Sequence, residues 1–380
     1  MRANLFSLSF LAAGIVAAGL ATEASYAQLP PNATVYASGL EGPRGLTFGP
    51  DGNLYVAEAG LGGSTATTGA CEQVPPPIGP YKGGVTARIS KIDKAGNRTT
   101  LASGLPSAND AMGDTLGVAD VAFLDGDLYA VLAGGGCSHG NPNIPNALAR
   151  INLRTGGWKT VADLSRALME YPAKYTSADD YEPDGTFYGL IAHRGRLLTV
   201  EPNHGQVFSV TPDGKVRQVI DLSASQGHIV PTSIAALDDA LYVGNLNLFP
   251  IDPQWAKIVT LSRDTYFPNP LPGFSGPQDE YPRWKVVSSK AGFTTVVGMK
   301  IGPDGLMYVL ELSAARGYPS PGAGKVVRVK RNGVIEDVVT GLTVPTGMTF
   351  GPDGRLYVSN LGAVPGAAGQ ILRFDVVPAM

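Results

Sequence analysis

The sequence predicts an all-β fold built from a repeated strand–turn–strand unit. Residues 45–48 and 54–57 alternate apolar and smaller side chains with the period of a pleated strand, and Pro50-Asp51-Gly52 between them is typical of a tight turn. Close copies occur at 297–309 and 344–358, and looser copies at 118–130, 188–199 and 231–243. The shortest spacing, 44 residues from Leu198 to Tyr242, matches one four-stranded propeller blade. We therefore expect a six-bladed β-propeller of four-stranded blades.

Each blade requires two outer strands after this unit. The expected pairs are 87–92 with 98–102, 149–153 with 158–161, 206–210 with 215–219, 257–261 with 284–287, and 325–329 with 334–339. One short helix is expected over 163–170. The last blade has only 370–374, and residues 33–40 resemble the outer strand at 99–105. We expect this N-terminal strand to join the last blade and close the ring, because closure removes an open sheet edge.

The N-terminal segment has the composition of a secretory signal peptide. Arg2 precedes an apolar run from Leu5 to Leu20, and Ser25 and Ala27 supply small residues at the usual cleavage position. We expect residues 1–27 to be removed and residues 28–380 to form one propeller domain in a secreted or periplasmic protein. An uncleaved N-terminal anchor is the alternative. No later stretch of the sequence is long and apolar enough to predict a membrane span.

Export would place the two cysteines in an oxidising compartment. Cys71 and Cys137 each lie in the long loop after the second strand, in blades one and two. Neighbouring blades present these loops on the same face. We therefore expect a Cys71–Cys137 disulfide, with two free thiols as the alternative.

Most long insertions are predicted on one face of the propeller. They are residues 61–84, 105–117, 133–146, 163–186, 245–255 and 312–323, whereas the opposite face has short Pro-Asp-Gly turns, with 263–283 as the exception. Loops on a rigid scaffold carry function more often than the scaffold itself. We therefore expect any site at the insertion-rich mouth of the central channel.

A carboxylate or amide ends the second strand of five of the six predicted blades: Glu58, Glu201, Asn245, Glu311 and Asn360. One hypothesis is a cluster for Ca²⁺ or for proton transfer, with Glu58, Glu201 and Glu311 as candidate metal ligands. The alternative is that each side chain satisfies backbone N–H groups at the start of a neighbouring inner strand, or that Glu58 pairs with Arg44. Repetition by blade favours this structural role, because a catalytic site needs asymmetry.

Histidines also gather at the predicted mouth. His139, His204 and His228 fall in its loops, and Glu201 and His204 are the candidates for a catalytic role. No pair has His-x-x-x-His spacing, which favours ordinary loop polarity, and turn chemistry explains Asp110, Asp114, Asp120, Asp179 and Asp180 on the same face. The candidate ligand-binding residues are Arg44, Glu58, Asp120, Tyr188, Glu201, Asn245, Glu311, Asn360, His139 and His228.

Several motifs resemble the ScyD/ScyE family of exported bacterial proteins. They include residues 37–40 (ASGL), 43–46 (PRGL), 49–58 (GPDGNLYVAE) and 158–164 (WKTVADL), and the resemblance spans residues 33–376. It implies a propeller that acts outside the cytoplasm. The family takes its name from cyanobacterial scytonemin biosynthesis, in which members are implicated in assembling an indole–phenol pigment. Most members occur without that pathway and have no assigned activity.

The same motifs resemble NHL-repeat propellers and the calcium-dependent gluconolactonase and phosphotriesterase superfamily. There, the metal ligands include Asn or Asp in the inner-strand motifs. The matching positions here are Arg44, Ala119, Tyr188, Thr232, Val297 and Thr346, none of which is acidic or an amide. This difference argues against that metal site, so a metal would require another arrangement of Glu58, Glu201, Glu311, Asn245 or Asn360.

The sequence thus supports two hypotheses for function. The first is an exported propeller that binds a small molecule, a glycan or a protein at its mouth. The second is a hydrolase-like or scytonemin-biosynthesis-like enzyme that uses channel carboxylates, with Ca²⁺ as a candidate cofactor. The formal net charge of −3 supplies no basic field, so nucleic acid is not expected as a partner.

Overall fold

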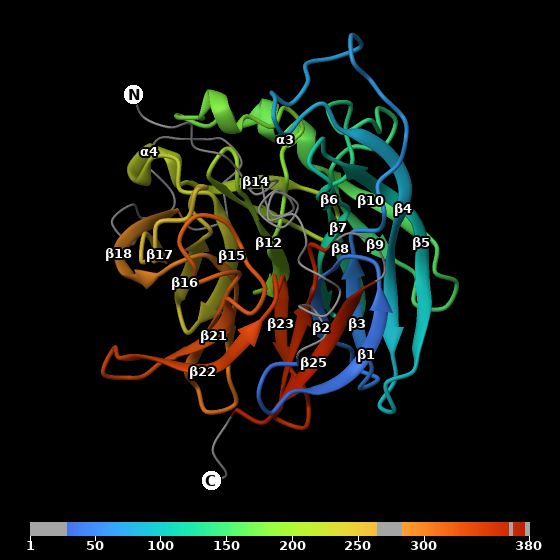
Figure 1. Cartoon of the computed structure of the whole chain (residues 1–380). Coiled ribbons are helices and arrows are strands. Elements are labelled where there is room, and N and C mark those ends of the chain that lie inside the picture. Colours follow the sequence, from blue (N-terminus) through green and yellow to red (C-terminus); the bar gives the residue numbers. More distant parts are fainter. Residues whose placement is uncertain (1–28, 264–282, 365–367, 377–380) are drawn as a thin grey trace.

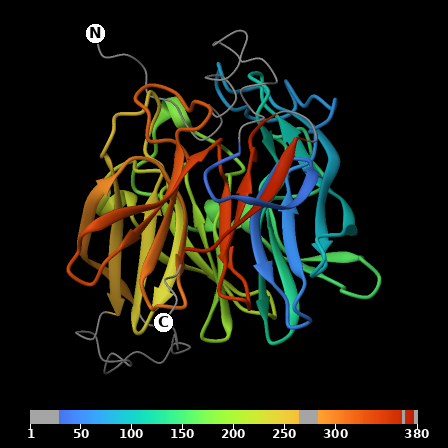
Figure 2. The ribbon, with the colours of Figure 1, turned by 60° about the horizontal axis from the view of Figure 1, so that its bottom comes forward.

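The computed structural model describes residues 29–263, 283–364 and 368–376, which form six antiparallel sheets around a common axis (Figures 1 and 2). This is the six-bladed propeller that the repeats predict. Helix α3 (Leu164–Glu170) is capped by the Asp163 side chain, which accepts from the Arg166 N–H, as the sequence led us to expect. The predicted signal peptide lies outside the described residues, as does nearly all of the insertion at 263–283.

The strands follow the expected order from the channel outward. Blade one holds β2 (Pro43–Phe48), β3 (Leu54–Glu58), β4 (Lys82–Ile92), β5 (Arg98–Asn109) and the short β6 (Thr115–Leu116). Blade two holds β7 (Val118–Leu124), β8 (Asp127–Leu132), β9 (Ala147–Ile151) and β10 (Trp158–Asp163), and blade three holds β11 (Leu190–His193), β12 (Arg196–Glu201), β13 (Gln206–Val210) and β14 (Val216–Asp221). Blade four holds β15 (Pro231–Leu237), β16 (Ala240–Asn245), β17 (Ala256–Arg263) and β18 (Trp284–Phe293), and blade five holds β19 (Val296–Ile301), β20 (Met307–Glu311), β21 (Gly324–Val329) and β22 (Ile335–Leu342). Short helical turns η2 (Ala178–Asp180) and α4 (Ser223–Gln226) lie in connections.

The ring closes as predicted. Blade six holds β23 (Gly347–Phe350), β24 (Leu356–Asn360) and β25 (Gly369–Phe374), and its outer strand is β1 (Thr34–Leu40). Strands β1 and β25 are antiparallel and lie side by side in Figure 1, with Val35 opposite Leu372. Ala37 and Leu40 of β1 are buried, so the N-terminal strand contributes to the core as well as to the sheet.

The sequence motif of the blades is explained by one repeated contact. The tyrosine hydroxyl of the second strand donates to the Asp of the preceding turn at 2.9 Å in three blades: Tyr55 to Asp51, Tyr308 to Asp304 and Tyr357 to Asp353. Each ring also meets a phenylalanine of the next blade edge to face, at centroid distances of 4.9–5.1 Å. A Cβ at Gly49 would lie 2.6 Å from the Tyr55 ring, which explains the glycine that precedes Pro-Asp-Gly. The motif therefore encodes both the turn and the packing between blades.

Blade one departs from expectation on the mouth face. We predicted loops at 61–84 and 105–117, but β4 already begins at Lys82 and β5 continues to Asn109. Lys82 and Asn109 are opposite each other in the β4–β5 ladder. Strand β6 then pairs with the end of β5, Leu116 opposite Ala108. The sequence missed this extension because Gly83-Gly84 and Pro106-Ser107 carry no strand signal. The β5–β6 hairpin consequently projects beside the mouth of the channel.

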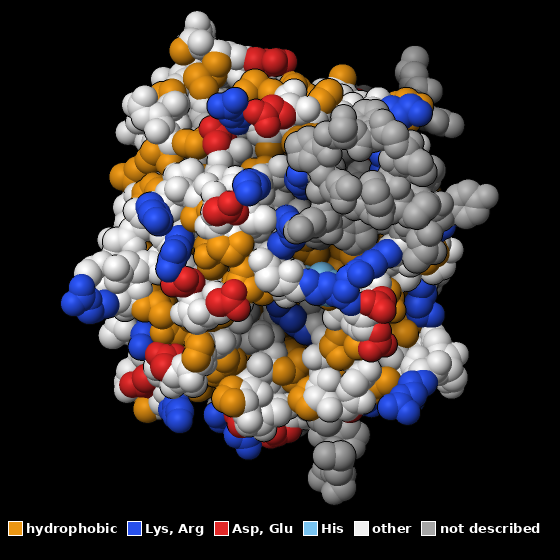
Figure 3. Space-filling view, turned by 180° about the vertical axis from the view of Figure 1, so that it is seen from behind, with side chains coloured by type: hydrophobic (Ala, Val, Ile, Leu, Met, Phe, Trp, Pro, Cys, Tyr) orange, Lys and Arg blue, Asp and Glu red, His pale blue; other side chains and the backbone are white. Residues whose placement is uncertain are grey.

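The surface carries both signs of charge. Acidic and basic side chains are interspersed on the face shown in Figure 3. None of the helices among the described residues has the length and apolar character that crossing a bilayer requires.

Candidate functional site

The polar residues that end the second strands bind backbone groups. The residues that lead into the first strand of the same blade donate to them: Glu41 N–H to Glu58 Oε2 at 2.6 Å, Thr186 N–H to Glu201 Oε1 at 3.0 Å, and Thr343 N–H to Asn360 Oδ1 at 2.8 Å. Asn245 uses its Nδ2 instead, donating to the Ile229 carbonyl at 2.8 Å. The contacts match the structural alternative, with the partner in the same blade rather than a neighbouring one. A ligand-binding or metal-binding role for these residues stays a prediction.

Glu58 and Glu311 differ in the partners that their carboxylate oxygens have. Glu58 is fully buried, accepts from Ser90, and lies 3.3 Å from both Arg88 and Arg98. The alternative pairing of Glu58 with Arg44 is not observed, because the Arg44 guanidinium bonds to Asp114, to Thr115 O and to Gly362 O. Glu311 is also buried, its Oε2 has no partner within the described residues, and burial raises its pKa to about 7.

The interior of the channel is narrow. The cavity between the six inner strands measures about 30 Å³, which is room for about two water molecules. Tyr188 of blade three reaches across the ring, and its hydroxyl donates to the Thr346 carbonyl of blade six at 3.1 Å. Burial raises the pKa of Tyr188 to about 12, so the hydroxyl stays protonated as a donor. This cavity is therefore too small for an organic ligand.

Asp120 also joins blades inside the channel. Its Oδ2 accepts from the Leu190 N–H of blade three at 2.8 Å, and its Oδ1 accepts from the Val121 N–H. Asp120 also lies against Gly45 of blade one, because a Cβ atom built on Gly45 would lie only 1.8 Å from Asp120 Oδ1. Burial raises the pKa of Asp120 to about 6, and the Lys300 charge opposes that rise. Asp120 thus links blades two and three and packs closely against the Gly45 backbone of blade one.

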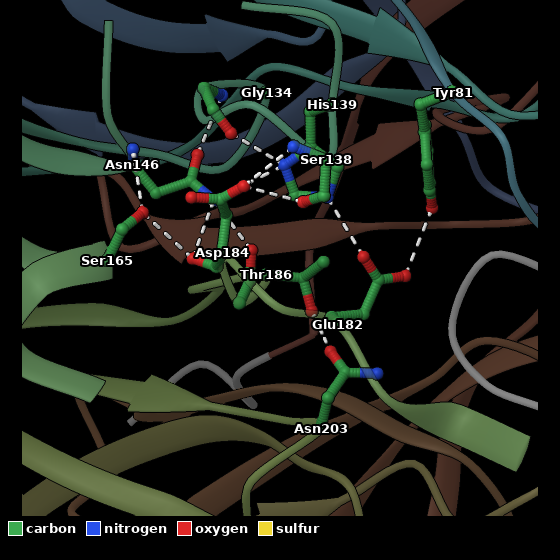
Figure 4. A network of polar contacts seen from close by, with 12 residues as sticks. Tyr81, Gly134, Ser138, His139, Asn146, Ser165, Glu182, Asp184, Thr186 and Asn203 are labelled. Atoms are coloured by element: carbon green, nitrogen blue, oxygen red, sulfur yellow. Dashed lines mark hydrogen bonds and ion pairs between the residues drawn. The ribbon is translucent and has the colours of Figure 1, made fainter. Parts of the chain in front are cut away.

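A buried polar network fastens the loops of blades one, two and three on the mouth face (Figure 4). At its centre, His139 Nε2 lies 2.9 Å from Glu182 Oε2, and His139 Nδ1 lies 2.6 Å from the Gly135 carbonyl. Tyr81 of the blade-one loop donates to the other Glu182 oxygen at 3.3 Å. Burial lowers the pKa of His139, but the Glu182 carboxylate outweighs it and the net direction is upward. With an oxygen beside each ring nitrogen, this position favours the protonated form of the His139 imidazole next to Glu182.

The insertion at 163–186, which carries Glu182, is also tied to blade two through Asp184. Ser138 donates to Asp184 Oδ2 from both its N–H, at 2.8 Å, and its hydroxyl, at 2.7 Å. Asn146 Nδ2 donates to the Asp184 and Gly185 carbonyls at 3.1 and 2.6 Å. The sequence analysis missed Glu182 and Asp184. The alternation of Asp180, Glu182 and Asp184 was the available signal, since all three carboxylates bond other loops: Glu182 and Asp184 bond the loop that carries Ser138 and His139, and Asp180 bonds His228.

The structure brings together the two candidates for a catalytic role. His204 Nδ1 lies 3.0 Å from Glu201 Oε2, and the His204 backbone N–H donates to the same oxygen at 2.6 Å. This geometry orients the imidazole and leaves Nε2 without a partner in the described part of the chain. The Glu201 charge raises the pKa of His204 against the opposing effect of burial. Beside it, His228 Nε2 bonds to Asp180 Oδ2 at 2.5 Å.

A metal centre is not assembled at these positions. Across residues 29–263, 283–364 and 368–376, no three His, Cys, Asp or Glu side chains are grouped so that they could hold a metal ion. The carboxylates at the ends of the second strands are separated by blade, and most of their oxygens accept from the chain.

The predicted disulfide is confirmed. Cys71 and Cys137 are bonded, and Thr67 Oγ1 donates to the Cys137 carbonyl at 2.5 Å. The bond joins the mouth loops of blades one and two, across a sequence separation of 66 residues.

Loss of this disulfide should destabilise the protein measurably. We expect the C71S/C137S double variant to lose about 2–4 kcal/mol of unfolding free energy, because the unfolded chain is no longer cross-linked. Urea titration of both proteins with and without reductant measures the effect. Reductant should lower the midpoint of the wild type and leave that of the variant unchanged. Equal midpoints for the two oxidised proteins would contradict the expectation.

A larger cavity lies beside the mouth. A cleft of about 580 Å³ is lined by Pro80, Lys82 and residues 109–113 of the β5–β6 hairpin. Its volume falls in the range of small-molecule sites. The Ala111 N–H donates to the Ile78 carbonyl at 2.9 Å, which fixes the hairpin to the blade-one loop. The cleft is therefore held between two ordered segments.

Asp110 is the buried acidic residue of this cleft. Its side chain is 4% exposed, and Oδ1 accepts from the Met112 and Asp114 N–H groups at 2.8 Å. Its Oδ2 has no hydrogen-bond partner among the residues that the structure describes. Burial and then the Asp114 carboxylate raise the pKa of Asp110 to about 8. Asp114 itself lies 3.2 Å from Arg44.

Comparison with known proteins supports the fold. No protein-family model matches the chain, and no curated protein matches it either, so the resemblance to the ScyD/ScyE family stays a prediction. Among solved structures, a protein of unknown function from Bacteroides thetaiotaomicron is 10% identical with a TM-score of 0.53, covering 90% of this chain and 75% of its own. An auxiliary nutrient binding protein from the same organism is 10% identical with a TM-score of 0.50, covering 89% of this chain and 70% of its own. A gluconolactonase from Xanthomonas campestris is 12% identical with a TM-score of 0.45, covering 92% and 99% of the two chains.

Proposed function

We propose that this protein is an exported propeller that binds a small polar molecule at its mouth, in the cleft between the β5–β6 hairpin and the blade-one loop. The observation that carries the proposal is the contrast in size between this cleft, about 580 Å³, and the channel cavity, about 30 Å³. Arg44, a predicted ligand-binding residue, belongs to the same region through its bond to Asp114. The disulfide at the mouth is consistent with export. A binding role is also the one named for the nutrient binding protein of the same fold.

A cleft-filling variant tests this proposal. Ala111 is exposed on the cleft wall, and Ala111→Trp would fill the space without disturbing the core. A panel of amino acids, amines, sugars and carboxylates is screened by thermal melting, since a ligand that binds the folded state raises Tm. We expect at least one compound to stabilise the wild type and lose its effect in Ala111→Trp. The matched control is Ala95→Trp, in the exposed β4–β5 turn on the opposite face. Hits that are unaffected by Ala111→Trp, or an absence of hits, would count against the cleft.

The second candidate function is an enzyme that uses Glu201 and His204. The contact of 3.0 Å between Glu201 Oε2 and His204 Nδ1 favours it, because a carboxylate that orients an imidazole is the arrangement of a general base. Neither Glu201 nor His204 lines the channel cavity or the cleft. The binding role therefore has the stronger support.

Metal removal separates the two functions. Because the candidate carboxylates accept from the chain itself, we expect the Tm with EDTA to equal the Tm with added Ca²⁺, and Glu201→Gln to show the same insensitivity. Thermal melts under both conditions measure this. A fall in Tm with EDTA that Ca²⁺ restores, and that is absent in Glu201→Gln, would instead support a calcium-dependent enzyme.

A further inference from the structure

We propose that residues 172–184 form a pH-sensitive strap over the Glu201–His204 pair, which is docked at mildly acidic pH and is released as the pH rises. These residues lie between helix α3 and strand β11. None of them lines the proposed binding cleft, so the strap is a device separate from the proposed function.

The strap is anchored by carboxylates rather than by apolar side chains. In residues 172–184, all of which the structure describes, no hydrophobic side chain is buried, and the nearest buried ones are Leu168 before the strap and Phe187 after it. The two buried residues of the strap are Asp180 and Glu182, which are 3% and 1% exposed. Segments with few buried apolar contacts are those that open locally in a folded protein. Attachment of the strap therefore depends on groups that can change their charge.

Both anchors bind histidines of other loops. Asp180 Oδ2 lies 2.5 Å from His228 Nε2, in the connection between blades three and four. Glu182 Oε2 lies 2.9 Å from His139 Nε2, in the β8–β9 loop of blade two (Figure 4). Two carboxylate–histidine pairs thus join the middle of the strap to loops on either side of blade three.

The two ends of the strap are fixed by hydrogen bonds. Near its start, the Lys174 N–H donates to Asp221 Oδ2 at 2.8 Å, at an exposed position. At its end, the Ser138 N–H and hydroxyl donate to Asp184 Oδ2. The middle of the strap can therefore lift while its ends stay attached.

The strap covers the Glu201–His204 pair. The Tyr181 ring meets the His204 ring edge to face at a centroid distance of 5.4 Å. Asn203, which lies in the turn between Glu201 and His204, donates to the Asp180 carbonyl and to its carboxylate, both at 3.1 Å. Release of the strap would break these contacts and open His204 to solvent.

The other titratable groups that face the strap and its histidines are mostly acidic. They are the carboxylates of Glu72, Asp184 and Glu201, the imidazole of His204 and the phenol of Tyr81. Deprotonation of Asp180 or of His139 therefore leaves negative charge without a balancing cation. Repulsion between the remaining carboxylates then favours release.

The direction of the pH dependence follows from the two anchors. Burial raises the pKa of Asp180 from 3.8 to about 6, although His228 opposes the rise. Burial lowers the pKa of His139, but Glu182 outweighs it, so this pKa stands above 6.5. A raised pKa stabilises docking fully below the solvated value, and the contribution is lost as the pH rises through the docked value. Docking is therefore favoured at acidic pH and weakens through neutrality.

Hydrogen exchange measures release of the strap in the oxidised mature protein. Mass spectrometry of peptides from 172–184, with rates corrected for the intrinsic pH dependence of exchange, gives the protection factor of the strap. We expect this factor to fall at least about tenfold between pH 5 and pH 8, the contribution of a carboxyl with a docked pKa of about 6 alone. Strand β24, which lies between β23 and β25, is the control segment and should keep its protection. Constant protection of the strap, a rise with pH, or an equal fall in β24 would overturn the proposal.

Asp180→Asn removes one titrating anchor and keeps an oxygen for Asn203. In this variant the fall in protection between pH 5 and pH 8 should be at least about threefold smaller than in wild type. The matched control is Asp179→Asn, which removes the adjacent exposed carboxylate and should leave the fall unchanged. An Asp180→Asn strap that loses protection as steeply as wild type would contradict the role of Asp180. Should Asp180→Asn fail to fold, the wild-type profile still decides between release and no release.

Discussion

Replacement of Glu182 by glutamine should destabilise the protein by about 3–5 kcal/mol, the range for a buried ion pair that loses one partner. Glu182 is 1% exposed and His139 is fully buried, so water cannot replace the lost carboxylate. The substitution also disturbs the Tyr81 contact, which joins the blade-one loop to the network. Urea unfolding of wild type and Glu182→Gln measures the difference.

The exposed pair of Arg166 and Glu170 supplies the control. Its atoms approach to 2.8 Å, but its side chains are 71% and 52% exposed. Glu170→Gln should therefore change stability by less than about 0.5 kcal/mol, as exposed helix pairs do. A Glu182→Gln variant within about 1 kcal/mol of wild type would show that the network does not hold an imidazolium–carboxylate pair.

The direction of the pH dependence follows from the same pair. The pKa of His139 is raised above its value of 6.5 in the unfolded chain. A raised pKa means that the folded state holds the proton more tightly, so the stabilisation is complete below pH 6.5 and is lost as the pH rises through the folded-state pKa. The difference in stability between wild type and Glu182→Gln should accordingly shrink at alkaline pH.

The fold was predictable because its signal is repeated and local. In three blades a tyrosine follows the Asp of a Pro-Asp-Gly turn by four positions, and the structure shows that the Tyr–Asp contact and the ring packing between blades both use that spacing. Closure was predictable for the same reason, since residues 33–40 repeat an outer-strand pattern. The β5–β6 hairpin was not, because its glycine-rich partner strand lacks side-chain alternation.

The site was less predictable because its contacts join loops distant in sequence. Glu201 and His204, the two candidates for a catalytic role, proved to be neighbours. However, the sequence could not show that Glu182 reaches His139, 43 positions away, or that Arg44 chooses Asp114 over Glu58. Asp110 appeared as ordinary turn chemistry, and its Oδ1 does serve the turn. Only the structure shows that Oδ2 remains unpaired.

Removal of strand β1 should have an effect at least as large as loss of Glu182. A chain that begins at Glu41 lacks the outer strand of blade six, exposes the edge of β25, and no longer buries Leu40 and Ala37. Loss of this apolar burial and of the ladder hydrogen bonds should cost on the order of 5 kcal/mol. That amount approaches the total stability of many domains, so we expect no cooperative unfolding transition from this chain.

The control for this truncation is a chain that begins at Leu29. It lacks the predicted leader but keeps all of β1, so its urea midpoint should match that of the mature protein. A peptide of residues 29–40 added to the shorter chain should restore part of the transition, because an open sheet edge accepts a strand in trans. If the chain beginning at Glu41 unfolds at the same midpoint as the control, β1 does not hold the ring closed. The cleft would then be expected to keep its shape without β1, since β5 and β6 belong to blade one.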